Sequence, residues 1–227
     1  MCGRYTLKTP IEAVADQFQF EELAEAKPRY NIAPSQQVAC VRVLPGLTRR
    51  VGAMLRWGLI PSWAKEPAME MKLINARAET VADKPAFRKP LRRRRCLVLA
   101  DGFYEWRREG NAKQPFYIRM KDKRPFAFAG LWDRWVPPEG QAMESCALLT
   151  TEPNELMATI HNRMPVILPP GAYDPWLDPD LHDVSVLTPF LHPYPAAEME
   201  AFPVSRKVNN PKFDDPACLN SIEKDQE

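Results

Sequence analysis

The sequence predicts a single, mainly β domain with short helices at its periphery. The chain has 227 residues, which suits one domain of above-average size. Short runs rich in β-branched and aromatic residues alternate with turn residues, and we find no internal repeat, glycine-rich phosphate loop or interdomain linker in the sequence. The 24 prolines exceed the average usage of about 5% and favour irregular connections over long helices.

The N-terminal part begins with a predicted short amphipathic helix. Thr9, Pro10 and Glu12 suit its N-cap, its first helical position and its capping-box partner. Residues 29–34 then form a predicted loop bounded by proline. Two apolar strands are expected next, at residues 38–44 and 51–59.

Residues 73–80 alternate strictly between polar and apolar side chains. In an extended strand, Asn75, Arg77 and Glu79 would share one face, so three polar groups would converge on one surface. The alternative is a half-exposed edge strand without a functional role. A short helix broken by prolines is expected to follow at residues 80–88.

Residues 96–100 form a predicted buried strand that leads into a turn at Asp101 and Gly102. Glu105 would therefore lie between aromatic residues just beyond a strand end. Desolvation in such a setting tends to raise the pKa of a carboxylate, which suits a proton shuttle. Equally, Glu105 could face solvent on an alternating strand.

The C-terminal part contains a predicted hairpin of strands at residues 114–120 and 125–132. The remaining elements are a strand at 145–151, a helix at 153–159 and a strand at 166–168. His161 falls in the loop after that helix, a position that favours a functional histidine slightly over a structural one. We expect residues 213–227 to be a disordered tail beyond a domain of residues 1–212.

Composition and charge exclude several classes of protein. The chain is 45% apolar and 26% charged, and no apolar run approaches the roughly 18 residues of a membrane span. The N-terminus lacks the pattern of a secretory signal, so a cytoplasmic protein is expected. Five cysteines without a C-x-x-C pair, and histidines without ligand spacing to them, predict reduced thiols and no metal. A net charge of +2 does not by itself imply nucleic acid, although residues 92–95 form a basic run.

Cys2 directly follows Met1 and could carry unusual chemistry. If Met1 is removed, Cys2 has a free α-amine and a thiol, which titrate near about 7.7–8.0 and about 8.5. The amine can condense with an aldehyde to an imine, and the thiol can then close onto the same carbon to give a thiazolidine. The thiolate could instead attack an acyl carbon, as in N-terminal-nucleophile amidases. A third possibility is that Cys2 has no chemical role.

The chain contains several spaced motifs in order: MCGRY, RYNIAP, WGLIPSW, LINARAET, DGFYEW, IHNRMPVIL and PVSRKVN. Together they resemble the SRAP (SOS response-associated peptidase) family, whose members shield abasic sites in single-stranded DNA. The resemblance runs from Met1 to about Asn210. It implies a single α+β domain with a curved, barrel-like, mainly antiparallel sheet, short peripheral helices and a positively charged DNA channel. No cofactor is expected.

The resemblance implies that Cys2, exposed by loss of Met1, attacks the open-chain aldehyde of an abasic site and forms the thiazolidine crosslink. Asn75 would help to hold the reacting sugar, Glu105 would handle protons near the amine, and His161 would protonate or deprotonate the sugar oxygen. Imine formation must expel water, so a carboxylate and a histidine near the amine suit this chemistry. The peptidase in the family name is expected to mean self-removal of Met1.

The resemblance also implies how DNA would bind. Arg4, Arg77 and Arg163 would contact phosphates that flank the lesion, and Gly3 would let the DNA backbone approach the terminus. The strand would be lined or wedged by Asn31, Pro34 and Trp63. Phosphate contacts carry no sequence information, so we expect lesion specificity, little sequence preference and weaker binding at high salt. The expected partner is single-stranded DNA containing abasic sites, bound by a monomer that would associate with the nucleoid in a bacterial host.

One position departs from the family pattern, since Asn162 stands where many relatives have an aspartate. If that acid tunes His161, the pKa of His161 and the reversal rate of the crosslink would be affected.

Two alternatives remain open from the sequence. An amidohydrolase or cysteine peptidase that uses Cys2 and His161 would form a transient acyl-enzyme and turn over many substrates. A non-catalytic module for single-stranded DNA would keep its salt-sensitive binding after Cys2→Ala.

Overall fold

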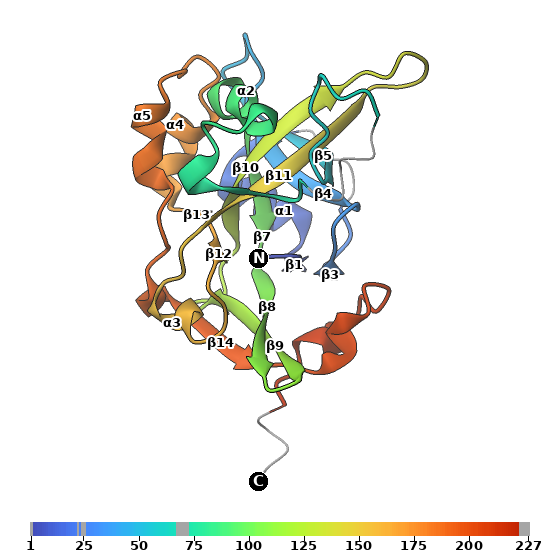
Figure 1. Cartoon of the computed structure of the whole chain (residues 1–227), viewed down its shortest axis with the longest axis vertical. Helices are drawn as coiled ribbons and strands as arrows, with labels where there is room; N and C mark the ends of the chain where they lie inside the picture. The colour runs from blue at the N-terminus through green and yellow to red at the C-terminus, as the bar shows by residue number, and fades with distance from the viewer. Residues whose placement is uncertain (1, 22, 24–25, 67–72, 223–227) are drawn as a thin grey trace.

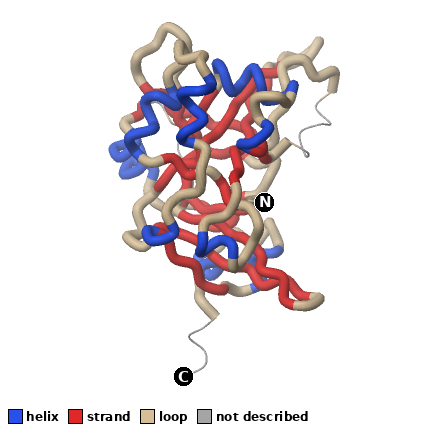
Figure 2. The backbone as a smooth tube through the Cα atoms, turned by 60° about the vertical axis from the view of Figure 1, so that its left-hand side comes forward, coloured by secondary structure: helices blue, strands red, loops and turns tan. Residues whose placement is uncertain are grey.

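The computed structural model of the chain describes residues 2–21, 23, 26–66 and 73–222. Its strands form two connected β-structures, one above the other in Figure 1. Helices and 3-10 turns lie mainly on the outside of the strands (Figure 2). Within the described residues, none of the helices combines the length and the apolar character that crossing a bilayer would need.

A closed five-stranded barrel forms the upper part of the domain in Figure 1. Its strands are β4 (Gln37–Arg42), β5 (Arg50–Trp57), β7 (Arg95–Ala100), β10 (Phe126–Trp135) and β11 (Met143–Thr151). Strand β4 pairs antiparallel with β5 and β7, and β10 pairs antiparallel with β7 and β11. Parallel pairing of β5 with β11, with Trp57 opposite Cys146, closes the ring. The α+β class with a barrel-like, mainly antiparallel core is thereby confirmed.

Short strands extend the barrel at its edges. The strand β6 (Asn75–Arg77) runs parallel to β11, with Asn75 opposite Leu148. The others are β2 (Phe20–Glu21) on β5, β12 (Met164–Pro165) on β11 and β13 (Ile167–Leu168) on β10. These additions matter for the site, because β6 carries Asn75 to the edge of the barrel.

A second, five-stranded sheet forms the lower part of the domain. Its order is β14 (Met199–Pro203), β9 (Ala112–Met120), β8 (Gly102–Glu109), β1 (Arg4–Leu7) and β3 (Arg29–Ile32). Strand β7 of the barrel runs almost directly into β8, with only Asp101 between them. The two β-structures therefore share one continuous stretch of chain, and β1 lies beside it.

Five short α-helices surround the strands in the described part of the chain: α1 (Ile11–Phe18), α2 (Pro85–Arg93), α3 (Glu155–Ala158), α4 (Tyr173–Leu177) and α5 (Val184–Leu187). The 3-10 helices are η2 (Ala78–Thr80), η3 (Pro170–Ala172), η4 (Thr188–Phe190), η5 (Ala196–Glu198), η6 (Arg206–Asn209) and η7 (Pro216–Leu219).

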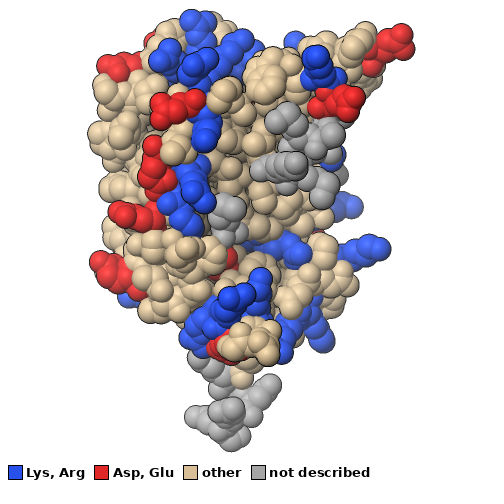
Figure 3. All heavy atoms as spheres, in the orientation of Figure 1, with Lys and Arg blue, Asp and Glu red and all other residues tan. Residues whose placement is uncertain are grey.

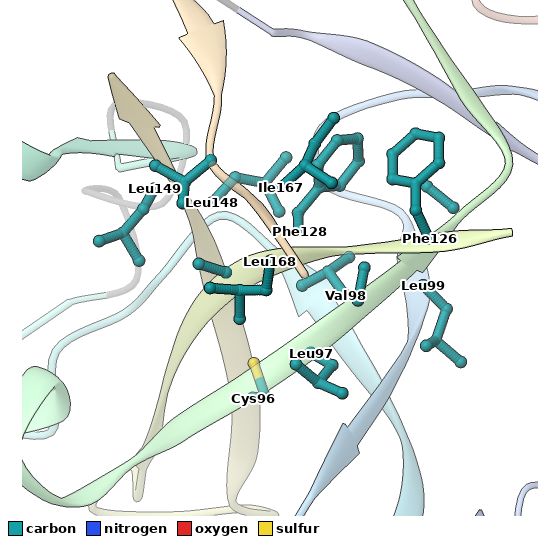
Figure 4. Close-up of a cluster of buried hydrophobic side chains, with 14 of the residues drawn as sticks. Cys96, Leu97, Val98, Leu99, Phe126, Phe128, Leu148, Leu149, Ile167 and Leu168 are labelled. Carbon is teal, nitrogen blue, oxygen red and sulfur yellow. The ribbon is translucent and has the colours of Figure 1, made fainter. Parts of the chain in front are cut away.

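The main core fills the barrel. All six residues of β7 are buried, and their apolar side chains meet those of β10, β11 and β13 (Figure 4). The contact is close enough that a Cβ added to Gly130 would lie 2.7 Å from the Cys96 sulfur, which explains a glycine inside a central strand. The five cysteines are all free and buried.

Several predictions in the first half of the chain were wrong in detail. Helix α1 begins at Ile11, with Pro10 rather than Thr9 at the N-cap position. Residues 29–34 are not a loop, because β3 (Arg29–Ile32) pairs with β1. The alternating strand ends at Arg77, and Glu79 lies on η2 rather than beside Asn75 and Arg77. Helix α2 starts at Pro85 instead of being broken there, since proline is well tolerated in the first turn.

The predicted hairpin of residues 114–120 and 125–132 was also wrong. Strand β9 pairs with β8 and β14, whereas β10 pairs with β7 and β11 in the barrel. The hairpin is formed instead by β8 and β9, whose turn contains Gly110 at a φ of 58°. That left-handed backbone favours glycine.

Residues 213–222 are packed, although we expected a disordered tail from residue 213. Both backbone amides of Tyr30 and Asn31 donate to the Asp214 carboxylate, at 2.6 and 2.9 Å. Cys218 on η7 is fully buried. Residues 223–227 lie outside the described part of the chain.

Candidate active site

The buried carboxylate of Asp101 fixes the N-terminal strand. Its Oδ1 accepts a hydrogen bond from the Thr6 hydroxyl at 2.5 Å, and its Oδ2 accepts from the backbone amides of Lys8 and Thr9 at 2.7 and 2.8 Å. The Thr6 hydroxyl also lies 2.9 Å from the Tyr117 hydroxyl. Because Asp101 immediately precedes β8, these bonds hold β1 in register against β8 and thereby fix the position of Cys2.

Cys2 is fully buried at the junction of the barrel and the second sheet. The Asn75 side-chain amide donates to the Cys2 carbonyl at 2.8 Å, so β6 at the edge of the barrel holds the short segment that leads into β1. The other amide atom of Asn75, Oδ1, is buried and accepts no hydrogen bond from the described residues. Burial, and then the nearby Glu105 carboxylate, raise the pKa of the Cys2 thiol, which is therefore protonated at neutral pH.

We had expected Glu105 just beyond the end of a strand, but it lies within β8. Tyr104 pairs with Arg4, so Glu105 is level with the start of β1. The Glu105 side chain is buried, with 2% of the residue exposed. It lines an open pocket of about 550 Å³ together with His161. The arrangement brings a carboxylate and an imidazole to the same cavity beside Cys2.

His161 is positioned by the short helix α3. The Asn154 side chain caps that helix by accepting from the Met157 amide at 2.8 Å, and the His161 amide donates to the Met157 carbonyl at 2.8 Å. The Arg163 amide donates to His161 Nδ1 at 3.0 Å. His161 Nδ1 also lies 3.2 Å from the Arg163 carbonyl, so the Arg163 backbone can satisfy Nδ1 in either tautomer of the ring.

Arg4 and Asn31 form a linked pair behind Cys2. Arg4 donates to Asn31 Oδ1 at 2.9 Å and to the carbonyls of Val208 and Asn209 at 2.7 and 3.2 Å. Asn31 is fully buried, and its Nδ2 donates to three carbonyls of residues 208–213. The side chain of Asn31 thus orients Arg4, which is only half-buried and whose pKa is lowered by burial.

Arg163 and Arg77 differ in how accessible they are. The Arg163 guanidinium makes a two-pronged ion pair with Glu79, at 2.7 and 3.0 Å, and also donates to the Thr150 carbonyl at 2.7 Å. This ion pair lowers the pKa of Glu79. Arg77 is exposed on β6, two residues from Asn75. Arg163 can therefore contact a phosphate only if it gives up or shares its ion pair with Glu79.

The remaining predicted contact residues lie at the surface near these strands. Gly3 and Pro34 are partly buried, and Trp63 has 56% of its surface exposed. Such exposure is unusual for a tryptophan and leaves its ring available for stacking.

Four residues of the pocket were not anticipated from the sequence. They are Trp106, Arg108, Lys113 and Asn209, which line it together with Glu105 and His161. The Trp106 indole N–H donates to Asn209 Oδ1 at 2.7 Å, which fixes the ring at the pocket wall. The sequence held part of the information needed to find these residues. Trp106 directly follows Glu105, and Arg108 and Lys113 flank the turn between β8 and β9. Their shared location depends on the β8–β9 hairpin, which we did not predict.

Within the described part of the chain, no three His, Cys, Asp or Glu side chains are grouped so that they could hold a metal ion. The site thus links the Cys2 thiol to a carboxamide and a carboxylate, and the carboxylate lines a cavity together with an imidazole and two cations. Such a set can form and break bonds to a carbonyl carbon by proton transfer.

The chain is similar to known proteins in both sequence and fold. The model of the SOS response associated peptidase (SRAP) family matches residues 1–211. The abasic site processing protein YoqW of Bacillus subtilis is 46% identical over 97% of this chain and 100% of its own length. The abasic site processing protein HMCES of Xenopus tropicalis is 34% identical over 86% of this chain and 67% of its own.

Solved structures show the same fold. A crystal structure of a Bacteroides thetaiotaomicron protein superimposes with a TM-score of 0.88 at 27% identity, covering 97% of this chain and 99% of the other. A Bordetella bronchiseptica protein gives a TM-score of 0.78 at 31% identity, covering 90% of this chain and 100% of the other. Because the family model covers residues 1–211 and the Bacillus relative is 46% identical over its full length, the chain belongs to the SOS response associated peptidase (SRAP) family.

Proposed function

We propose that this chain processes abasic sites in DNA and shields them covalently in single strands, through a thiazolidine formed by Cys2 after Met1 is removed. The names of the Bacillus and Xenopus relatives, abasic site processing proteins, support abasic DNA as the substrate. The proposal is carried by the contacts of Cys2 with Asn75 and Glu105, and by the pocket that Glu105 lines together with His161.

The reaction balances without a cofactor. The Cys2 amine adds to the aldehyde of the ring-opened sugar, and the resulting carbinolamine loses one water to give an imine. The Cys2 thiol then adds to the imine carbon, forming the C–S bond while its proton moves to the nitrogen. The product is a five-membered ring that joins the protein to the DNA.

Each polar side chain has a defined part in this scheme. Asn75 holds the Cys2 carbonyl through Nδ2 and offers its unoccupied, buried Oδ1 to the substrate. Glu105 takes and returns protons near the amine, and His161 does so at the sugar oxygen on the other side of the pocket. Opening of the sugar exposes the aldehyde that the amine needs.

The raised pKa of the Cys2 thiol also bears on the alternative of acyl transfer. A peptidase would need the thiolate as nucleophile, whereas burial and the Glu105 charge keep the thiol protonated. Addition of a neutral thiol to an imine has no such requirement. We therefore propose that Cys2 does not act as an acyl-transfer nucleophile on other proteins; self-removal of Met1 would require the thiol to lose its proton first.

DNA would bind along the surface that surrounds the cavity. Arg4, Arg77 and Arg163 would contact phosphates, with Arg163 released from Glu79 when DNA arrives. Gly3 would admit the backbone, Pro34 and Trp63 would line the strand, and the buried Asn31 would act through Arg4, whose guanidinium it holds. We propose that a monomer binds single strands with little sequence preference.

The proposal is tested with a single-stranded oligonucleotide that carries one abasic site. Incubation followed by denaturing electrophoresis should give a shifted band for the wild-type protein and none for Cys2→Ala. The variant Cys218→Ala is a matched control, because it also removes a buried thiol, but far along the chain. Absence of the band with wild type, or an equal band with Cys2→Ala, would overturn the proposal.

A further inference from the structure

The outer face of helix α2 carries a dense group of positive charges. Its four exposed cations are Arg88, Lys89, Arg92 and Arg93, and Lys84 at the N-cap position is exposed as well. We call these five residues the α2 basic face. The opposite side of the helix is apolar and packs into the domain through Phe87, Pro90 and Leu91. The amphipathic pattern thus leaves the charges on the solvent side.

The four arginines of residues 92–95 form two pairs with different roles. Arg95 is buried and donates to the carbonyls of four residues, including Leu91 and Trp176 at 2.8 and 2.6 Å. Arg94 is paired with the buried Asp133. Arg92 and Arg93, in contrast, have neither an ion pair nor a side-chain hydrogen bond within the described residues. Two arginines of the run serve folding, and the other two remain at the surface.

The charges of the α2 basic face are arranged unfavourably for the helix itself. Arg88 and Arg92, and likewise Lys89 and Arg93, are four residues apart, where like charges repel. The first turn contains no acidic residue, and Lys84 places a cation at the positive end of the helix dipole. Asp83 is the single carboxylate in residues 81–93. A bound polyanion would remove these repulsions.

The α2 basic face is connected to the candidate active site by a short stretch of chain. Lys84 is the seventh residue after Arg77, which limits the distance between their Cα atoms to about 25 Å. Arg77 in turn lies two residues from Asn75, the partner of Cys2. Figure 3 shows Lys and Arg gathered at the upper end of the molecule, over α2, and continuing down the middle of the same face.

We propose that the α2 basic face binds the phosphodiester backbone of the DNA that flanks the lesion, as a second contact region beyond the active site. The inference rests on the proposed function, because it takes the same DNA as ligand. A duplex has one phosphate per about 3.4 Å of each strand, so the span of up to about 25 Å between Arg77 and Lys84 corresponds to about seven phosphates.

The composition of the face favours a nucleic-acid backbone. It consists of flexible cations with no exposed aromatic or large apolar side chain among residues 84–93. Lysine and arginine at such a surface bind phosphates without reading bases, and affinity gained in this way depends on salt. A membrane-binding helix would instead need an apolar face toward the lipid, and the apolar face of α2 is packed inside the domain.

The test compares two variants of equal charge loss in a Cys2→Ala background, where binding stays reversible. Arg92→Gln with Arg93→Gln removes two charges from the face. Lys121→Gln with Lys123→Gln removes two exposed charges from the turn between β9 and β10. Each is titrated with a short abasic oligonucleotide, with about two nucleotides on either side of the lesion, and with a long one with about twelve.

The α2 variant should bind the long oligonucleotide more weakly, and its slope of log affinity against log salt should fall by about 1.4 for single-stranded flanks or about 1.8 for a duplex flank. The ratio of the affinity of the Cys2→Ala parent to that of the α2 variant, for the long oligonucleotide, should therefore decrease about tenfold between about 50 and 200 mM salt. Separate long substrates with a duplex on the 5′ or the 3′ side identify the flank concerned. Binding of the short oligonucleotide should be unchanged.

Three outcomes would overturn the inference: equal effects of both double variants, an equal loss on the short oligonucleotide, or no effect on the long one. Thermal unfolding of the variants checks that α2 remains folded. Crosslinking is measured separately, with Cys2 intact and the short oligonucleotide. Failure of that reaction in the wild type would refute the proposed function, whereas the flank contact is read from reversible binding.

Discussion

Replacement of Asn75 by alanine tests the geometry of the site most sharply among single variants. The change removes the 2.8 Å hydrogen bond to the Cys2 carbonyl and the buried acceptor Oδ1. Each neutral hydrogen bond is worth about 1 kcal/mol, and about 1.4 kcal/mol corresponds to a tenfold change in rate. Loss of the positioning bond alone predicts crosslinking about fivefold slower, and loss of a substrate bond as well predicts about 30-fold.

The assay is the rate of adduct formation with an abasic oligonucleotide under single-turnover conditions. Asn111→Ala is the matched control, because it removes an exposed asparagine from the β8–β9 turn and should react at the wild-type rate. Thermal unfolding separates a local effect from loss of the fold. A folded Asn75→Ala protein that crosslinks at the wild-type rate would refute the role given to Asn75.

Three further variants test the environment of the Cys2 thiol, the ion pair of Arg163 and the structural role of Arg95. Glu105→Gln removes a negative charge that raises the pKa of the Cys2 thiol, so thiol alkylation should shift to lower pH while crosslinking slows; an unshifted profile would argue against their coupling. Glu79→Gln breaks an exposed ion pair, which should cost less than about 1 kcal/mol of stability and free Arg163 for phosphates. DNA binding should then tighten at low salt, and weaker binding would show that the pair orders the site. Arg95→Met leaves four carbonyls without their donor and should lower the free energy of unfolding by about 3 kcal/mol or more in denaturant titrations; a loss below about 1 kcal/mol would contradict its structural role.

Local patterns predicted much of the fold, because many signals were short-range. The apolar run at residues 96–100 is the fully buried strand β7, and the run at 145–151 lies within β11. Sheet pairing was harder, since it depends on contacts between distant residues. The turn at residues 121–124 looks like a hairpin turn but carries the chain from the second sheet to the barrel.

The candidate site was predictable where chemistry depends on residue type and order. Cys2, Asn75, Glu105 and His161 come from four separated motifs, and the fold brings them to one region. The environment of each side chain could not be read from the sequence. Asn31 is an example, because its full burial follows from packing of residues 208–213, which we had partly expected to be disordered.

Mass analysis of the adduct tests the central claim most directly. The protein is reacted with an abasic oligonucleotide without a reductant, the DNA is digested, and the N-terminal peptide is sequenced by mass spectrometry. We expect a peptide that begins at Cys2, lacks Met1, and carries the sugar with the loss of one water, bound through both nitrogen and sulfur. A modified peptide that retains Met1, or a sugar attached at any other residue, would contradict it.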